Sequence, residues 1–216
     1  MELTESTCVA VVVAAAALVL AVMYCVRKQR RTREHHQKPL PSGCTPQRIA
    51  IIGVSGCGKS TLGQHMAQRL GRNFIELDDI WYTPGVWTCR EEFERQCHLQ
   101  RFTGLNRWIS AGTLYLTLNT PLWKQADTII WLDRGFCCSF YRYCRRGIAC
   151  LRSGSKRYRH TRHFLSRLFS RPLNYYRRLP EYKSLFSVFS EAWPEKRFIR
   201  VQTQEMVDEL LSQLSP

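Results

Sequence analysis

The chain has 216 residues, enough for one domain of ordinary size with a sizeable core and a further short segment. Its formal net charge of +15 favours an anionic partner, such as a nucleotide, a nucleic acid or a lipid headgroup. The ten cysteines are scattered, with Cys57 in a glycine-rich loop and Cys8 and Cys25 in an apolar run. This distribution argues against a secreted disulfide scaffold and favours a reducing compartment.

The N-terminal segment reads as a membrane anchor. The 19 residues from Cys8 to Val26 carry no charge, which is just enough for a helix to span a hydrocarbon core of about 30 Å. Glu2 and Glu5 precede this run and basic residues follow it, so a signal peptide is the weaker alternative, as is a buried helix of the domain. We therefore expect a single-pass anchor over residues 1–27, with the N-terminus outside and the remaining chain in the cytosol. The basic residues after the run should also attract anionic lipid headgroups at the membrane.

A basic, proline-containing linker is expected over residues 28–46, followed by one folded domain over 47–216. The domain opens with Ile49–Ile52, four apolar β-formers that run into a glycine turn, and a helical pattern follows from Thr61. The turn satisfies the pattern G-x-x-x-x-G-K-[ST] in its strand–loop–helix setting, although an ordinary glycine-rich turn is the structural alternative.

Such a loop binds polyphosphate, because its backbone N–H groups and the start of the helix both face the anion. Lys59 is placed to reach the β- and γ-phosphates, and the Ser60 hydroxyl to ligate Mg²⁺. The predicted nucleotide-binding residues are Gly53, Ser55, Gly56, Cys57, Gly58, Lys59, Ser60 and Thr61.

Further along the chain, strands and helices alternate. Strands are expected at residues 73–77, 108–111, 127–133 and 197–201, and helices at 136–146, 160–189 and 204–214. Thr88 and Glu91 form a capping box, so another helix is expected from about Thr88 to Gln96. This order predicts an α/β fold of the P-loop NTPase type: three layers, with a five-stranded parallel sheet between helices and ligands at the carboxyl ends of the strands.

A family resemblance rests on the phosphate loop together with several later motifs. These are Leu77-Asp78, Trp81-Tyr82, Pro84-Gly85, Arg90–Phe93, Arg107–Ile109 and Ala126–Asp133. Their order resembles the adenylate-kinase-like P-loop kinases and is most similar to the DNA topology modulation (FlaR-like) kinases. The resemblance implies a core, an acceptor-binding insert at about residues 79–107 and an arginine-rich lid at about 134–183.

Arginines in the lid are candidates for catalysis, because phosphoryl transfer depends largely on stabilising charge on phosphoryl oxygens. By the resemblance, the lid would close over the triphosphate with Arg142, with Arg145 or Arg146, and with Arg177 or Arg178. For most lid arginines a solvated basic surface is the simpler explanation. Tyrosines interleave with them, so nucleic-acid binding is a further alternative.

Two carboxylates complete the predicted site. Asp78, after the second strand, would hold the acceptor hydroxyl, or it caps a turn. The related kinases normally end their third strand in Asp-Gly, and that aspartate helps hold the waters of the metal, whereas this chain has Ala111-Gly112. Asp133, at the end of the fourth strand, is the candidate replacement on the metal side, or a turn residue.

The sequence therefore predicts a kinase that uses ATP and Mg²⁺ to phosphorylate a small acceptor, such as a nucleoside monophosphate. One alternative is a degenerate, membrane-tethered nucleotide-binding protein, with Ala111 marking lost catalysis. The other is a nucleic-acid-binding protein that uses the basic lid. The oligomeric state is left open.

Overall fold

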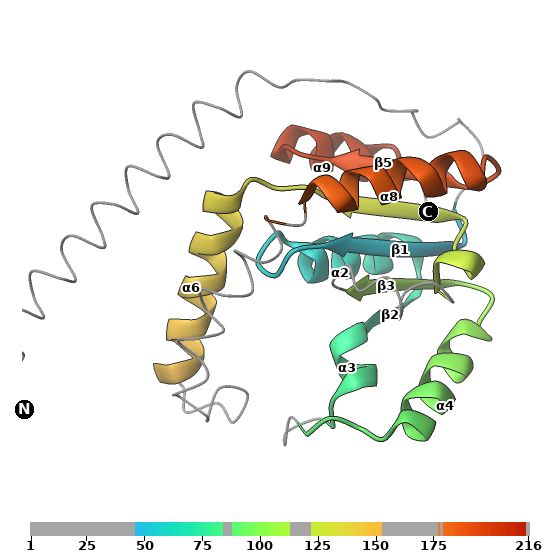
Figure 1. The fold of residues 1–216 in the computed structure, drawn as a ribbon, viewed down its shortest axis with the longest axis horizontal. Coiled ribbons are helices and arrows are strands. Elements are labelled where there is room, and N and C mark those ends of the chain that lie inside the picture. The colour runs from blue at the N-terminus through green and yellow to red at the C-terminus, as the bar shows by residue number, and fades with distance from the viewer. Residues whose placement is uncertain (1–45, 84–87, 113–121, 153–176, 178, 215–216) are drawn as a thin grey trace, which may run out of the picture.

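A computed structural model of the protein describes residues 46–83, 88–112, 122–152, 177 and 179–214 (Figure 1). The strands are β1 (Arg48–Gly53), β2 (Asn73–Glu76), β3 (Trp108–Gly112), β4 (Thr128–Leu132) and β5 (Arg197–Val201). The helices are α2 (Lys59–Leu70), α3 (Leu77–Trp81), α4 (Glu92–Thr103), α6 (Phe136–Arg152), α8 (Leu179–Ala192) and α9 (Gln204–Ser212).

The five strands form one parallel sheet in the order β2-β3-β1-β4-β5, which confirms the predicted architecture. β1 lies at the centre of the sheet. Its residues Ile49–Ile52 are at most 2% exposed, as expected for a strand that is covered on both faces. Trp108 on β3 and Trp131 on β4 are also buried, so they fill the core as expected. The carboxyl ends of these strands meet at one edge of the sheet.

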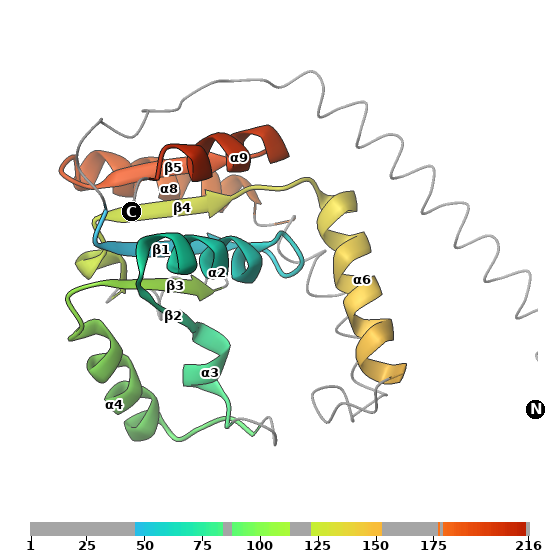
Figure 2. The same cartoon turned by 180° about the vertical axis from the view of Figure 1, so that it is seen from behind.

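Helices cover both faces of the sheet. α2 and α9 lie on the face turned to the viewer in Figure 2, and α8 lies on the opposite face, which is turned to the viewer in Figure 1. α6 stands beyond the carboxyl ends of the strands, next to the loop that follows β1. The elements therefore form three layers with one open edge, where α6 and the β1–α2 loop meet.

The predicted capping box at the start of α4 is wrong. α4 begins at Glu92, with Glu91 at the N-cap position and no side-chain cap. Thr88 is used differently: its carbonyl oxygen accepts the Thr83 N–H at 2.9 Å, and Cys89 beside it forms an antiparallel bridge with Tyr82. This pairing keeps Thr88 in a hairpin-like segment, so its hydroxyl does not cap the helix.

Gly63 lets α2 pack closely against β2. A Cβ atom at this position would lie 2.3 Å from Cε2 of Phe74, which is inside any normal contact distance. We expect Gly63→Ala to lower the free energy of unfolding by about 1–3 kcal/mol, because overpacking outweighs the gain in helix propensity. Chemical denaturation measures this change. Gln64→Ala, on the exposed face of α2, is the control and should change stability by less than about 0.5 kcal/mol. A Gly63→Ala protein as stable as the wild type would contradict the packing argument.

The expected membrane localisation needs correction. Within the described ranges, from residue 46 to 214 with their gaps, no helix combines the length and apolarity needed to cross a bilayer. The apolar run at residues 8–26, which we expected to do so, lies outside the described residues, as does nearly all of the linker. The predicted single-pass localisation is therefore corrected: the described part of the chain holds no span that supports it.

Candidate active site

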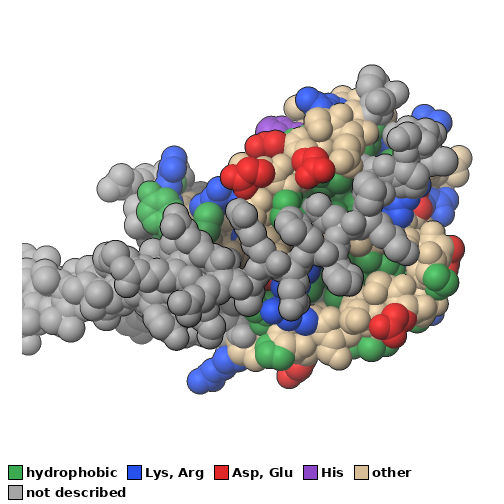
Figure 3. All heavy atoms as spheres, turned by 90° about the horizontal axis from the view of Figure 1, so that it is seen from above, with side chains coloured by type: hydrophobic (Ala, Val, Ile, Leu, Met, Phe, Trp, Pro, Cys, Tyr) green, Lys and Arg blue, Asp and Glu red, His purple; other side chains and the backbone are tan. Residues whose placement is uncertain are grey.

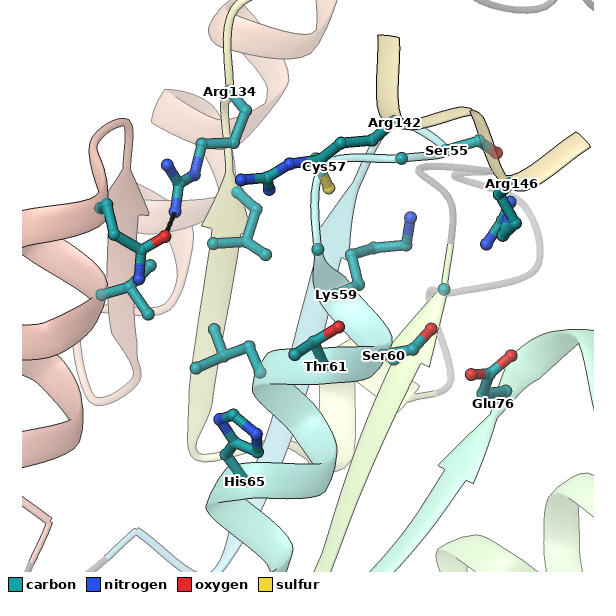
Figure 4. Close-up of a pocket in the computed structure, with 18 of the residues that line it drawn as sticks. Ser55, Cys57, Lys59, Ser60, Thr61, His65, Glu76, Arg134, Arg142 and Arg146 are labelled. Carbon is teal, nitrogen blue, oxygen red and sulfur yellow. Dashed lines mark hydrogen bonds between the residues drawn. The ribbon is translucent and has the colours of Figure 1, made fainter. Parts of the chain in front are cut away.

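A cavity of about 470 Å³ opens at the carboxyl edge of the sheet (Figure 4). This volume is in the range of small-molecule sites. The lining residues come from the β1–α2 loop, the end of β2, α3, the ends of β3 and β4, and helices α2, α6 and α9. Segments far apart in the sequence thus share one cavity, at the edge where ligands bind in parallel α/β sheets.

The β1–α2 loop forms the floor of this cavity. Seven of the predicted nucleotide-binding residues line the cavity, from this loop and the first turn of α2, namely Ser55, Gly56, Cys57, Gly58, Lys59, Ser60 and Thr61. Gly53 does not line it. Gly53 is the last residue of β1, and it permits the close approach of β1 to β4, because a Cβ atom there would lie 2.6 Å from the Leu132 carbonyl oxygen.

Lys59 is held close to the loop by its side chain. Its Nζ donates a hydrogen bond to the Val54 carbonyl oxygen at 2.9 Å, so the ammonium folds back over the loop. It lines the cavity beside the Ser60 hydroxyl, at the start of α2, where the positive end of the helix dipole adds to the field.

The first half of α6 packs directly against this loop. Gly56 has a φ of +88°, and a Cβ atom on it would lie 2.2 Å from the Ser139 carbonyl oxygen. Arg142 and Arg146 are four residues apart, so they lie on one side of the helix and line the cavity, whereas Arg145 does not. Of the other two predicted lid arginines, Arg177 is exposed and does not line the cavity, and Arg178 lies outside the described residues.

The structure adds one cation that the sequence analysis missed. Arg134 follows β4, is 9% exposed and lines the cavity. Burial lowers its pKa, and the nearby Arg142 guanidinium lowers it further. Its position two residues after a buried strand was the available sequence signal, because such positions reach the carboxyl edge of the sheet.

Two carboxylates lie on the wall formed by β2 and α3. Asp78, a predicted site residue, lines the cavity from the first turn of α3. Glu76, the last residue of β2, also lines it, and Figure 4 shows its carboxylate on the side of the cavity where Ser60 lies. Glu76 is the register partner of Ala111 on β3. A carboxylate is therefore present one strand away from the position where the related kinases carry their aspartate.

Asp133 has a different environment from the one expected for a metal ligand. Its Oδ2 accepts hydrogen bonds from Arg200 Nε at 2.9 Å and from Gln202 Nε2 at 3.4 Å. The residue is 7% exposed and does not line the cavity. The ion pair with Arg200 across the β4–β5 edge uses the carboxylate, so this geometry argues against the predicted metal role.

We expect Asp133→Asn to affect stability and leave the metal dependence unchanged. Losing the charge leaves Arg200 without its ion-pair partner, which should lower the free energy of unfolding by about 1–3 kcal/mol. Chemical denaturation measures the loss of stability. Titration of kinase activity with Mg²⁺ tests whether the metal dependence stays unchanged. Glu209→Gln, at an exposed position of α9 that does not line the cavity, is the control. A higher Mg²⁺ requirement in Asp133→Asn would restore the metal role.

Comparisons with known proteins relate this site to the shikimate kinases. A family model described as shikimate kinase matches residues 55–102. The shikimate kinase of Persephonella marina is 29% identical over 100 residues, which cover 39% of this chain and 60% of that enzyme. The solved shikimate kinase from Acinetobacter baumannii in complex with shikimate has a TM-score of 0.50 and 18% identity, and the match covers 77% of this chain and 89% of that one. This last likeness shows a shared fold.

The fold and the site define the chain as a small-molecule P-loop kinase, a class that uses ATP and Mg²⁺. The uncharacterized protein YqaC of Bacillus subtilis is 32% identical over 127 residues, which cover 54% of this chain and 68% of that protein. The chain belongs to the same family as YqaC. The narrower resemblance to the DNA topology modulation kinases is not confirmed by these matches, and the chain spans only 60% of the length of the Persephonella enzyme.

The nucleic-acid alternative gains no support from these relatives. Figure 3 shows Lys and Arg side chains interspersed with Asp and Glu side chains over the described part of one face of the molecule. In the described residues, the arginines Arg134, Arg142 and Arg146 line the cavity together with Lys59. Their placement favours a small anion over an extended polyanion.

Proposed function

We propose that the protein transfers the γ-phosphoryl group of ATP to a small acceptor, with a nucleoside monophosphate as the first candidate. The observation that carries this proposal is that Lys59, Arg142 and Arg146 face the same cavity as the carboxylates of Glu76 and Asp78. Cations suit the triphosphate, the charge of the transition state and the phosphate of a nucleoside monophosphate, while a carboxylate suits an acceptor that attacks through a hydroxyl. The acceptor insert at about residues 79–107 and the lid at about 134–183 are part of this proposal.

The triphosphate would lie on the β1–α2 loop, with the nucleoside directed toward α9. Val207 and Leu211 supply an apolar wall on that side, and His65 adds a polar group. A mostly apolar surface with a few polar groups is the usual setting for a heterocycle. The acceptor would then occupy the opposite end, beside Asp78 and Gly112.

The residues present suit Mg²⁺. Ser60 offers a hydroxyl and Glu76 a carboxylate on the same side of the cavity, and hard oxygen donors are what this ion prefers (Figure 4). When bound with ATP, Mg²⁺ supplies charge neutralisation at the β- and γ-phosphates. Ser60 would hold it directly and Glu76 would hold its waters.

In the proposed reaction, Lys59 would leave the Val54 carbonyl oxygen and pair with phosphate oxygens. Arg142 and Arg146 would stabilise the charge that develops on the transferred group. An acceptor hydroxyl would donate a hydrogen bond to Asp78, which would orient its oxygen for in-line transfer and take its proton as the γ-phosphoryl group leaves ADP. A nucleoside monophosphate would instead attack through a phosphate oxygen, which the cavity arginines would orient. The apolar and basic walls would keep water from competing as the acceptor.

The second candidate is a degenerate kinase that binds ATP without transferring phosphate. The argument for this degenerate kinase is that Ala111 stands where the related kinases carry an aspartate. Glu76 lies in register beside Ala111 and lines the cavity, so a carboxylate remains available at this edge. We therefore favour the enzyme.

An acceptor panel tests the proposal. The full chain would be incubated with ATP, Mg²⁺ and nucleoside monophosphates, shikimate, gluconate or other hydroxyl compounds, and ADP formation would be followed with and without acceptor. ADP release that depends on one acceptor class supports the kinase and identifies its substrate. Tight ATP binding with no transfer to any acceptor would support the degenerate alternative.

A further inference from the structure

Gln204 connects α9 to the cation that follows β4. We propose that Gln204 is a positioning residue for the nucleotide: it holds the Arg134 guanidinium at the cavity and leaves the positive charge of that group intact. This inference rests on the proposed nucleotide-binding function and adds a residue that no phosphate-loop or lid motif includes.

Two hydrogen bonds connect Arg134, which follows β4, to Gln204 and Asp208 on α9. Gln204 Oε1 accepts a hydrogen bond from Arg134 Nη2 at 2.8 Å (Figure 4, dashed line). The amide nitrogen of the same side chain, Nε2, donates to Asp208 Oδ1 at 3.0 Å. Because a carboxylate only accepts, Asp208 selects the amide orientation in which the oxygen of Gln204 faces Arg134.

The start of α9 is itself held in place. The Thr203 side chain caps the helix by accepting the Met206 N–H at 3.3 Å. Gln204 is the first residue of α9 and Asp208 lies one turn later, so both side chains project from the same face of a capped helix. A side chain on such a support can fix the position of a guanidinium better than one on an open loop.

A neutral acceptor suits the charge balance around Arg134. This guanidinium is largely buried and close to Arg142, and both conditions disfavour its charge, whereas the nearby Glu205 carboxylate favours it. A hydrogen bond from the Gln204 oxygen stabilises the guanidinium without cancelling its charge, whereas a carboxylate at the same place would form an ion pair. The cavity therefore keeps Arg134 and Arg142 as two adjacent cations, an arrangement that an anionic polyphosphate would stabilise.

The test compares Gln204→Ala and Gln204→Glu in the full chain, with and without Arg134→Ala. The probe is the non-hydrolysable ATP analogue AMP-PNP with Mg²⁺, and binding is measured by calorimetry. We expect Gln204→Ala to weaken binding about tenfold and Gln204→Glu to weaken it at least as much, since the new carboxylate keeps the geometry but neutralises the guanidinium. In the Arg134→Ala background, Gln204→Ala should have almost no further effect, as expected for residues that act through one another.

Gln213→Ala is the matched control. Gln213, at the C-cap of α9, likewise donates its Nε2 to an acid one turn away, Glu209 Oε1 at 3.3 Å, but it does not line the cavity. The Gln213→Ala variant should bind AMP-PNP with the affinity of the wild type. Melting temperatures of all variants separate loss of fold from loss of binding.

Three results would overturn the inference. They are unchanged binding in Gln204→Ala, wild-type affinity in Gln204→Glu, and equal effects of Gln204→Ala with and without Arg134. In each of these cases, binding of AMP-PNP by the wild-type protein would still support the proposed function. Absence of AMP-PNP binding by the folded wild type would instead remove the proposed function, and this inference with it.

Discussion

Lys59→Met should lower kcat for phosphoryl transfer by about 10³-fold while the protein stays folded. Methionine keeps an apolar stem of similar length and removes only the ammonium group. That group lies on the β1–α2 loop, hydrogen-bonded to the Val54 carbonyl oxygen at 2.9 Å, next to Ser60 and the start of α2. A preorganised charge at this place stabilises developing negative charge on the phosphoryl oxygens, and removing one such group costs about 10²–10³-fold in rate.

The measurement is steady-state turnover with the acceptor that the panel identifies, together with the melting temperature. Lys124→Met is the matched control, since Lys124 is exposed, precedes β4 at the other end of the strand and does not line the cavity. It should retain wild-type kcat. A Lys59→Met protein that turns over at the wild-type rate would show that the loop does not carry the chemistry.

The second large effect is expected at Glu76. Glu76→Gln should lower kcat about 10- to 100-fold and raise the Mg²⁺ concentration needed for half-maximal activity, as loss of an outer partner of a bound metal does. The residue lines the cavity on the side of Ser60, and an amide cannot replace the charge of a carboxylate toward the waters of the ion.

Ala111→Asp offers a rescue in the same experiment. Glu76 and Ala111 are register partners on neighbouring parallel strands, so an aspartate at 111 places a carboxylate beside the lost one. We expect the double variant Glu76→Gln/Ala111→Asp to recover part of the Mg²⁺ response. Glu94→Gln, exposed on α4, controls for the loss of one surface charge. If Glu76→Gln matches the wild type at every Mg²⁺ concentration, the role proposed for Glu76 is wrong.

Much of the phosphate loop could be predicted because its geometry is local. Ile49–Ile52, the glycine turn and the helix from Lys59 are adjacent in the chain, so the motif and its conformation depend on neighbours in sequence. The same holds for Arg142 and Arg146, whose spacing of four places them on one side of any helix. The prediction of a helix cap at Thr88 failed because pairing between Tyr82 and Cys89 outweighed the local capping signal.

The acids were harder to assign because their roles depend on strand pairing. Asp133 looked like a metal-side acid at a strand end, but β5 brings Arg200 and Gln202 to its carboxylate. Glu76 looked like an ordinary strand residue until the β2–β3 register placed it beside Ala111. Neither partner is recognisable from spacing, since the contacts join residues 35 or more positions apart.

The amino-acid sequence by itself determined the class of the protein: a parallel α/β core that carries a polyphosphate-binding loop and basic residues after its fourth strand. These features follow from hydrophobic periodicity, glycine placement and helical spacing, which act over a few residues. Only the tertiary structure decided which charges share the cavity. It brought Glu76 and Arg134 in, left Arg145 and Asp133 out, and joined Gln204 to Arg134, because register and helix packing act between segments that the sequence keeps apart.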